Sequence, residues 1–165
     1  MKVINFCSPK EEYGFLSNFS YHSFETEEFS RKTCSIYKLF WRTSEHYYQA
    51  MKFVGIDYKY AEKIRLSHTP FKAAILGRDK SYTLRPDWEH IKEIIMERAL
   101  MAKFSQNLDI KEGLIDTGDA ILVEHRSADR YWGDGGNGTG KNRLGFLLMK
   151  VRDALKEIQN GEQTF

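Results

Sequence analysis

The stretch Trp41-Arg-Thr-Ser-Glu-His-Tyr-Tyr-Gln-Ala-Met-Lys-Phe53 contains the helix around which we expect the rest of the chain to be arranged. Thr43 or Ser44 can act as its N-cap, because a hydroxyl oxygen accepts one of the backbone N–H groups that the first turn leaves unpaired. We expect the helix to reach about Val54. At about 100° per residue, one of its sides is apolar and predicts a face packed in the core. This side consists of Tyr47, Ala50, Met51 and Val54.

The opposite side of this helix gathers an acid, a phenol, an amide and an ammonium group: Glu45, Tyr48, Gln49 and Lys52. Such a face is typical of the wall of a polar pocket, and it is also typical of a helix in contact with solvent. A carboxylate in the first turn has an ordinary explanation, because the helix macrodipole stabilises it by roughly 0.3–1 kcal/mol. The same dipole favours the charged form of Glu45, which suits a base or an anion facing a cationic transition state better than a proton donor.

Composition and charge are those of an ordinary soluble globular protein. The 165 residues are enough for one domain with a core, and 25 Lys and Arg against 23 Asp and Glu give a net charge of +2. This balance argues against an extended nucleic-acid track but leaves room for a local basic site. Two cysteines without a CxxC motif predict neither a disulfide framework nor a thiolate zinc site. We expect a cytoplasmic protein without a signal peptide or a membrane span.

The other elements follow from periodicity and capping residues. We expect short strands at residues 2–6, 35–42 and 120–124. We expect further helices at residues 57–66, 70–77, 87–104 and 108–117, and a last one after Asn142. The polar, irregular residues 25–35 predict an exposed loop. Together these elements predict an α+β fold, a single helix-rich domain with a few short strands over residues 1–159, followed by a frayed tail at 160–165.

Three features outside the first helix have both a structural and a functional interpretation. Ser17 and Asn18 can bind a ligand's hydroxyl or phosphate groups, or they can stabilise a turn through its own backbone. Trp88, at the start of a helix, can be a core residue or can line a pocket. The segment before the first helix is locally basic, which predicts either a solvated loop or a few contacts with phosphate groups. Its basic residues are Arg31, Lys32, Lys38 and Arg42.

A glycine-rich segment runs from Asp129 to Asn142. Residues 135–141 match the G-x-x-x-x-G-K part of a phosphate-binding loop, but Asn142 stands where such a loop needs Ser or Thr to hold magnesium. No apolar strand precedes the segment either, so we exclude ATP hydrolysis. The loop can still bind an anion through its backbone N–H groups, with added charge from Lys141 and Arg143, or it can be a flexible surface loop. The five histidines show no zinc-ligand spacing, and we expect no metal.

Taken together, these segments resemble the YbiA-like family, also called NADAR. The matching segments run in the family's order over nearly the whole chain, and the blocks around Glu45 and Trp132 are specific. The segments are Phe15-Leu-Ser-Asn-Phe19, Ser44-Glu-His-Tyr-Tyr-Gln-Ala-Met-Lys-Phe53, Asp87-Trp88, Lys103-Phe-Ser-Gln-Asn107, Thr117-Gly118, Leu122-Val-Glu124 and Asp129-x-x-Trp-Gly-x-Gly-x-x-Gly-x-Gly-x-Asn-x-Leu-Gly145.

Members of this family are N-glycosidases. The resemblance implies cleavage of the bond between C1 of a phosphorylated ribose and an exocyclic amine of a pyrimidinone-type ring, without metal or cofactor. The family's two substrate classes are early riboflavin-synthesis intermediates and guanine that carries ADP-ribose. The resemblance implies Glu45 and Asp129 as the catalytic carboxylates. The substrate-binding residues that it implies, with two tryptophans as aromatic walls, are Ser17, Asn18, Tyr48, Lys52, Trp88, Trp132, Gly133, Gly135 and Asn142.

A different class of function stays open at this point: a module that binds ADP-ribose or a nucleotide without turning it over. The paired carboxylates favour an enzyme, because glycoside hydrolysis passes through an oxocarbenium-like state that such a pair stabilises. The expected partner is a small nucleotide or an ADP-ribosylated guanine, free or in single-stranded nucleic acid. In a duplex the target amine lies on the enclosed minor-groove edge of guanine. The choice between the two substrates and the oligomeric state are left open.

Overall fold

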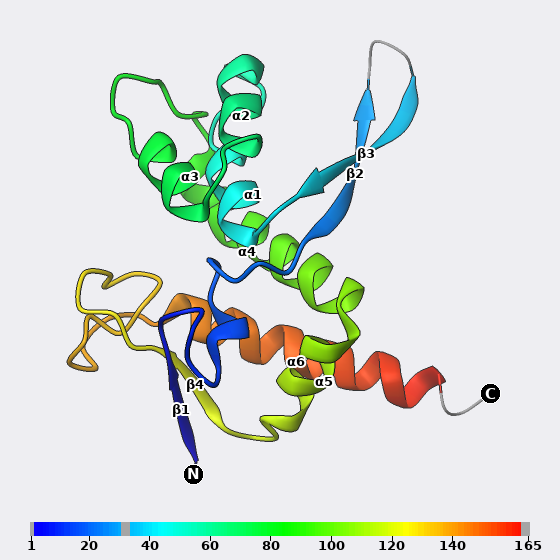
Figure 1. Ribbon diagram of the computed structural model, residues 1–165, viewed down its shortest axis with the longest axis vertical. Coiled ribbons are helices and arrows are strands. Elements are labelled where there is room, and N and C mark those ends of the chain that lie inside the picture. Colours follow the sequence, from blue (N-terminus) through cyan, green and yellow to red (C-terminus); the bar gives the residue numbers. More distant parts are fainter. Residues whose placement is uncertain (1, 31–33, 163–165) are drawn as a thin grey trace. The chain divides into compact units, whose positions relative to one another are not determined.

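The computed structural model describes residues 2–30 and 34–162. The chain divides into two compact units, of which the first contains residues 1–20 and 107–165 and the second contains residues 21–106. The prediction of one domain over residues 1–159 stays a prediction. Figure 1 shows that helices dominate both units and that the strands are few, which confirms the predicted α+β class. Within the described part of the chain, no helix is both long enough and apolar enough to cross a membrane.

The second unit consists of a β-hairpin followed by four helices. Its elements are β2 (Phe24–Ser30), β3 (Ser35–Trp41), α1 (Ser44–Met51), α2 (Tyr58–Arg65), α3 (Pro70–Gly77) and α4 (Trp88–Gln106). Helix α1 is central, because it contacts α2, α3 and α4 and all of its residues are buried. The side chains of Thr43, Asp57 and Thr69 cap α1, α2 and α3, as their residue types predict. Helix α1 ends at Met51, three residues before the predicted end.

The hairpin corrects the exposed loop predicted for residues 25–35, because β2 begins at Phe24 and pairs with β3 in an antiparallel ladder. Phe24 lies opposite Trp41, and the buried Thr26 accepts a hydrogen bond of 2.8 Å from the indole N–H of Trp41. Phe24 and Thr26 are buried, whereas Glu25 and Glu27 between and after them are exposed. Because three of residues 25–28 are glutamates, the sequence is polar enough to predict a loop. Residues 31–33 of the predicted loop lie outside the described residues.

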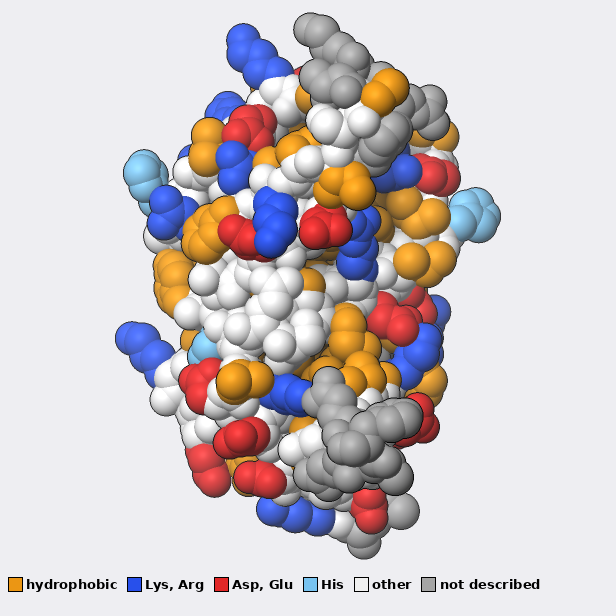
Figure 2. All heavy atoms as spheres, turned by 90° about the vertical axis from the view of Figure 1, so that its right-hand side faces the viewer, with side chains coloured by type: hydrophobic (Ala, Val, Ile, Leu, Met, Phe, Trp, Pro, Cys, Tyr) orange, Lys and Arg blue, Asp and Glu red, His pale blue; other side chains and the backbone are white. Residues whose placement is uncertain are grey.

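The basic segment predicted before α1 is balanced by acidic residues of β2. Lys38 lies 3.5 Å from a carboxylate oxygen of Glu25. Arg31 and Lys32 lie outside the described residues, and Arg42 is exposed. Figure 2 shows Lys and Arg side chains interspersed with Asp and Glu side chains rather than gathered into one continuous basic surface. The described residues of this segment therefore favour a solvated surface over a phosphate-binding track.

The first unit combines a two-stranded parallel sheet with helices. Its elements are β1 (Val3–Phe6), the short 3₁₀ helix η1 (Gly14–Leu16), α5 (Leu108–Asp116), β4 (Ile121–Glu124) and α6 (Arg143–Glu162). Strands β1 and β4 pair with Val3 opposite Ile121, and α6 contacts both β4 and α5. The buried guanidinium of Arg152 donates to Thr117 Oγ1 at 3.0 Å and to the Ala120 carbonyl at 2.9 Å, which ties α6 to the turn before β4. Helix α6 continues to Glu162, past the predicted start of the frayed tail at residue 160, and residues 163–165 of that tail lie outside the described residues.

Candidate active site

The start of α1 is fixed by a hydrogen-bonded histidine. Thr43 Oγ1 accepts the backbone N–H of His46 and lies 2.8 Å from His46 Nδ1. His46 Nε2 lies 3.0 Å from the Ser67 carbonyl oxygen, and because a carbonyl only accepts, Nε2 carries the proton. Burial lowers the pKa of His46, which keeps the imidazole neutral in this network. The network holds the helical turn that carries Glu45.

The polar face of α1 is buried, which excludes a helix face in contact with solvent. Glu45 is 6% exposed, Gln49 is 3% exposed and Tyr48 is 6% exposed. The Gln49 amide, one turn along the helix, donates a hydrogen bond of 2.8 Å to Glu45 Oε1. A buried carboxylate needs such donors, because burial of a charge without partners is strongly unfavourable. Of the two interpretations that the sequence leaves open, burial rules out the solvated surface, and the pocket wall stays a prediction.

Lys52 follows α1 and lies against two aromatic rings. Its ammonium nitrogen is 5.4 Å from the centre of the Tyr48 ring and 5.7 Å from that of Trp88, and it donates to the Gly77 carbonyl at 3.0 Å. The two rings lie 5.0 Å apart at an angle of 58°. Burial lowers the pKa of Lys52 to about 8, although the charge of Glu45 acts in the opposite direction. Trp88 is itself buried, so it is a core residue that also borders this cationic position.

An open cavity with a volume of about 530 Å³ lies beside Lys52. Its lining residues are Lys52, Gly77, Arg78, Asp79, Lys80, Tyr82 and Leu84. Ligand cavities in proteins typically measure roughly 300–1,000 Å³, so this cavity is large enough for a small molecule. The second unit thus contains a buried carboxylate with its amide partner, and an ammonium group beside two aromatic rings; of these residues, Lys52 lines the cavity.

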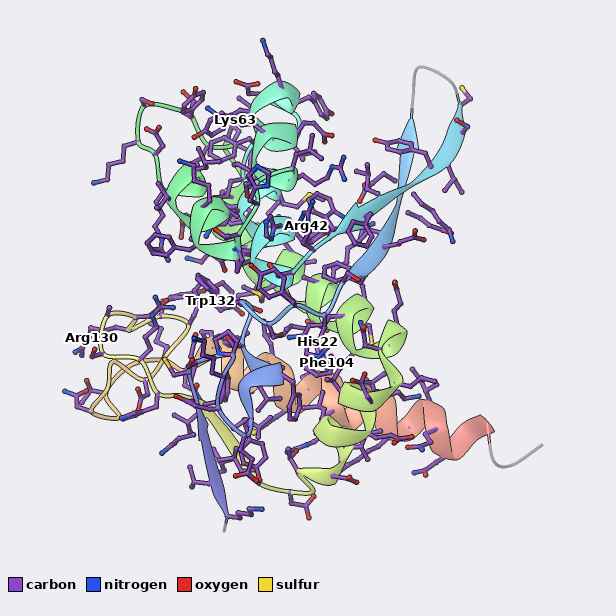
Figure 3. The ribbon with its side chains drawn as sticks, viewed as in Figure 1. His22, Arg42, Lys63, Phe104, Arg130 and Trp132 are labelled. Carbon is purple, nitrogen blue, oxygen red and sulfur yellow. The ribbon has the colours of Figure 1, made fainter. Side chains whose placement is uncertain are left out.

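In the first unit, Asp129 organises the turn that opens the glycine-rich loop. Its Oδ1 accepts backbone N–H groups from Tyr131 at 2.9 Å, Trp132 at 2.8 Å and Gly133 at 3.5 Å. The ring of Trp132 meets that of Tyr131 edge-on, with 5.1 Å between their centres. Figure 3 shows Trp132 and Arg130 on this loop. A structural task is therefore established for Asp129, and its catalytic role stays a prediction.

Several backbone N–H groups of the glycine-rich loop are hydrogen-bonded within the loop, and substrate binding by Gly133 and Gly135 stays a prediction. The N–H of Gly135 donates to the Asp129 carbonyl at 3.0 Å, and that of Gly136 donates to Asp134 Oδ1 at 2.7 Å. The N–H of Gly140 donates to the Asp134 carbonyl at 2.7 Å. At Gly136 a positive φ of 72° and a close approach to Ser127 both require glycine. These N–H groups face the loop's own oxygens, and the compact loop is not the flexible one considered above.

Asn142 joins this loop to β4. Its side-chain Oδ1 accepts the Glu124 N–H at 2.9 Å, and its Nδ2 donates to the Leu122 carbonyl at 2.8 Å. Asn142 also has a φ of 47°, a left-handed conformation that asparagine tolerates better than most residues. These bonds explain why an amide, rather than the hydroxyl of an ATP-binding loop, occupies position 142. Its contact with substrate stays a prediction.

The turn after η1 supports the structural interpretation of Ser17. Its hydroxyl oxygen accepts the Phe19 N–H at 3.2 Å, and its carbonyl accepts the Ser20 hydroxyl at 2.8 Å. Asn18 is also buried. Among the described residues, no group of three or more His, Cys, Asp or Glu side chains could hold a metal ion.

Each unit contains some of the predicted site residues, and Ser17 and Asn18 lie in the turn after η1. Glu45, Tyr48, Lys52 and Trp88 lie together in the second unit, whereas those from Asp129 to Asn142 share one loop of the first unit. The sequence prediction misses Gly77 and Arg78 as neighbours of Lys52, because only the packing of α3 on α1 brings them there. The one available signal is the charged run Arg78-Asp-Lys80 directly after the glycine.

Residues 5–156 match the family model described as the NADAR domain. The chain belongs to the NADAR domain family. It is 48% identical over 153 residues to N-glycosidase YbiA of Escherichia coli, covering 93% of this chain and 88% of that protein. It is 40% identical over 157 residues to N-glycosidase Npun_R5314 of Nostoc punctiforme, covering 94% of each chain. It is also 40% identical over 154 residues to the riboflavin biosynthesis protein VVA0006 of Vibrio vulnificus, covering 93% of this chain but 39% of that protein.

The fold of this NADAR protein is also that of a solved relative. The NMR structure of the E. coli protein YbiA matches it with a TM-score of 0.82 and 45% identity, covering 96% of this chain and 87% of that chain. The family resemblance drawn from the blocks around Glu45 and Trp132 is thereby confirmed. At this identity over nearly the whole of each N-glycosidase relative, the NADAR protein is a hydrolase of the glycosidase class.

Proposed function

We propose that this protein hydrolyses the bond between C1 of a phosphorylated ribose and an exocyclic amine on a pyrimidinone-type ring, and that its first substrate is guanine carrying ADP-ribose. The observation that carries the proposal is the buried Glu45–Gln49 pair beside Lys52 and the Tyr48–Trp88 rings. Early riboflavin-synthesis intermediates contain the same type of bond and form the second substrate class.

Glu45 is proposed as the carboxylate that acts at C1. In the reaction the C1–N bond breaks, the oxygen of water bonds to C1, and the departing nitrogen gains a proton to become a free amine. Positive charge develops on the ribose in the transition state, and a fixed carboxylate stabilises it or takes a proton from the attacking water. Burial strengthens this interaction, because little water screens it and the Gln49 amide has already oriented the carboxylate.

The aromatic rings and Lys52 are proposed to bind the substrate. The Trp88 and Tyr48 rings border Lys52 and are proposed to contact the base, because stacking of a base on an aromatic side chain contributes about 1–3 kcal/mol. Lys52, with a pKa of about 8, is mostly charged at neutral pH and suits a negatively charged group of the substrate. Asp129 is proposed as the second carboxylate. Its bonds to three N–H groups support a role in holding the loop that carries Trp132.

The relatives' names support an N-glycosidase and leave the substrate open between the two classes. Two relatives are called N-glycosidases, and one of which this chain covers 39% is called a riboflavin biosynthesis protein. We rank ADP-ribosylated guanine first, because the cavity of about 530 Å³ beside Lys52 is larger than the single phosphate group of a riboflavin-synthesis intermediate requires.

The test is incubation of the purified protein with ADP-ribosylated guanosine and, separately, with a phosphoribosylamino-pyrimidine intermediate of riboflavin synthesis. Liquid chromatography should show free ADP-ribose and guanosine in the first reaction, at a higher kcat/KM than the release of ribose 5-phosphate in the second. A higher kcat/KM for the riboflavin intermediate would reverse the order of substrates. Tight binding of ADP-ribose without turnover of either compound would contradict the proposal and indicate a binding module.

A further inference from the structure

The cavity beside Lys52 contains more positive than negative charge. Three of its lining residues are cations, Lys52, Arg78 and Lys80, and one is a carboxylate, Asp79. Arg78 and Lys80 follow the last turn of α3, so the α1–α3 contact places both next to the end of α1. The surplus of positive charge lines a hollow rather than a convex surface, which is the arrangement that concentrates an anion.

The carboxylate in this cavity is engaged elsewhere. Asp79 Oδ1 accepts the hydroxyl of Ser81 at 2.6 Å and the backbone N–H of Ser81 at 3.0 Å. These hydrogen bonds lower the pKa of Asp79 and hold it in the turn after α3. Among the described residues, neither the guanidinium of Arg78 nor the ammonium of Lys80 forms an ion pair with it or with any other carboxylate. Two of the three cations therefore have no carboxylate partner in the part of the chain that the structure describes.

The cations also act on one another. The charge of Arg78 adds to the effect of burial in lowering the pKa of Lys52. Like charges held together around a cavity are unfavourable in the empty protein, and an anion that enters the cavity relieves this repulsion. An arginine suits a phosphate especially well, because its guanidinium can donate two parallel hydrogen bonds to two phosphate oxygens.

We propose that Lys52, Arg78 and Lys80 form a phosphate-binding subsite that receives the phosphoryl group carried by the ribose of the substrate. This inference rests on the proposed function for the identity of the ligand. Lys52 connects the two parts, because it lies against the Tyr48 and Trp88 rings and also lines the cavity. The proposed substrate has the matching order of groups: a flat heterocycle, then the ribose, then the phosphate. The subsite makes Arg78 and Lys80 determinants of affinity for the phosphorylated part of the substrate.

A structural explanation of the two exposed cations competes with this one. Basic side chains at a helix C-terminus interact favourably with the helix dipole, and Arg78 directly follows α3. In that case replacing Arg78 and Lys80 would lower the melting temperature and leave ligand affinity unchanged. If the two cations instead bind phosphate, the same replacement should weaken ligand affinity and leave the melting temperature unchanged.

The test compares the full-length wild type with an Arg78→Gln/Lys80→Gln double variant by calorimetric titration of ADP-ribose and of ribose 5-phosphate. The Kd for both probes should rise at least tenfold, whereas kcat should stay within twofold and KM should rise with Kd. A Lys59→Gln/Lys72→Gln variant removes the same charge from exposed positions of the second unit outside this cavity. Its Kd values should stay within twofold of the wild type.

Because ribose 5-phosphate carries one phosphate group and ADP-ribose carries two, comparing the probes shows how many phosphate groups the subsite binds. A larger loss for ADP-ribose than for ribose 5-phosphate would assign both phosphates to the subsite, and equal losses would assign one. Unchanged Kd values, equal losses in the control variant, or no binding of either probe to the wild type would overturn the subsite. Since binding needs no turnover, a wild type that binds both probes but cleaves neither substrate contradicts the proposed function alone.

Discussion

The amide of Gln49 donates a hydrogen bond of 2.8 Å to Glu45 Oε1, one turn away on the same buried helix face. The bond fixes the direction of the carboxylate before any substrate arrives. It also couples the carboxylate to α3, because the other end of the Gln49 amide lies against Gly77. Substitutions at positions 49 and 77 should therefore change the orientation of the Glu45 carboxylate without altering its charge.

Replacing Gln49 with leucine should impair both stability and activity. Leucine fills a similar volume but leaves the buried Glu45 carboxylate without this donor, so we expect a loss of about 1–3 kcal/mol in the free energy of unfolding. We expect kcat to fall about tenfold, because the carboxylate is no longer held in one orientation. Gln106→Leu is the control, since Gln106 bonds the backbone of Glu25 at 2.8 Å and 2.9 Å. Gln106→Leu should lower stability and leave kcat unchanged. If kcat falls equally in Gln49→Leu and Gln106→Leu, the role of Gln49 is purely structural.

Gly77→Ala should separate α3 from α1. An added Cβ would lie 2.0 Å from Gln49 Oε1 and 2.7 Å from Gln49 Cβ, too close for either atom to stay in place. Overpacking of this kind lowers the free energy of unfolding by about 1–3 kcal/mol, and here it should also lower kcat. Gly161→Ala in α6 meets no atom within 4 Å and should be neutral or slightly stabilising. Urea denaturation of both variants is the measurement, and equal stabilities would show that the α1–α3 contact is looser than described.

The fully buried Lys103 predicts a pH dependence of stability. Burial lowers its pKa to about 7, well below the value of a lysine in the unfolded chain. Between pH 7 and about 10 the unfolded state therefore binds more protons than the folded state, and stability from this group rises with pH. From pH 7 to pH 9, wild-type stability should rise by about 2 kcal/mol relative to Lys103→Met. Parallel pH profiles from urea denaturation would contradict this.

Lys52 predicts a pH dependence of binding. Its pKa of about 8 means that its positive charge is present at pH 7 and largely lost at pH 9, while the phosphates of ADP-ribose stay ionised. The Kd for ADP-ribose, measured by titration calorimetry, should therefore rise several-fold over this range. Lys52→Gln should bind weakly at both pH values with little change between them. An equally steep pH profile in Lys52→Gln would assign the titration to another group.

The sequence predicts the local part of this fold well. The cap at Thr43 and the apolar side of α1 depend only on neighbours along the chain, and the structure confirms that Thr43 caps the helix and that Tyr47, Ala50 and Met51 are buried. Strand β2 is missed because its outer edge is completed by side chains of α4: Gln106 bonds the Glu25 backbone, and Arg98 donates to the Glu27 carbonyl at 2.8 Å. These hydrogen bonds from α4 depend on tertiary packing, which cannot be inferred from the polar sequence of residues 25–28.

The candidate site could be predicted in its residue types but not in its arrangement. Two interpretations of the polar face of α1 stay open in the sequence, because burial of Glu45 depends on elements distant along the chain. The glycine-rich loop has the composition of an anion cradle, but the positive φ values of Gly135, Gly136 and Gly138 accompany a compact loop closed by its own hydrogen bonds. Composition alone does not give the direction of an N–H group.

The most direct test of the central claim is the turnover of ADP-ribosylated guanosine by Glu45→Gln. Glutamine has nearly the same shape but cannot act as an anion or a base, so kcat should fall about 100-fold or more, while Kd for ADP-ribose stays within a few-fold. Glu112→Gln, at an exposed position of α5, should leave kcat unchanged. Release of ADP-ribose by Glu45→Gln at the wild-type rate would contradict the assignment of Glu45 as the catalytic carboxylate.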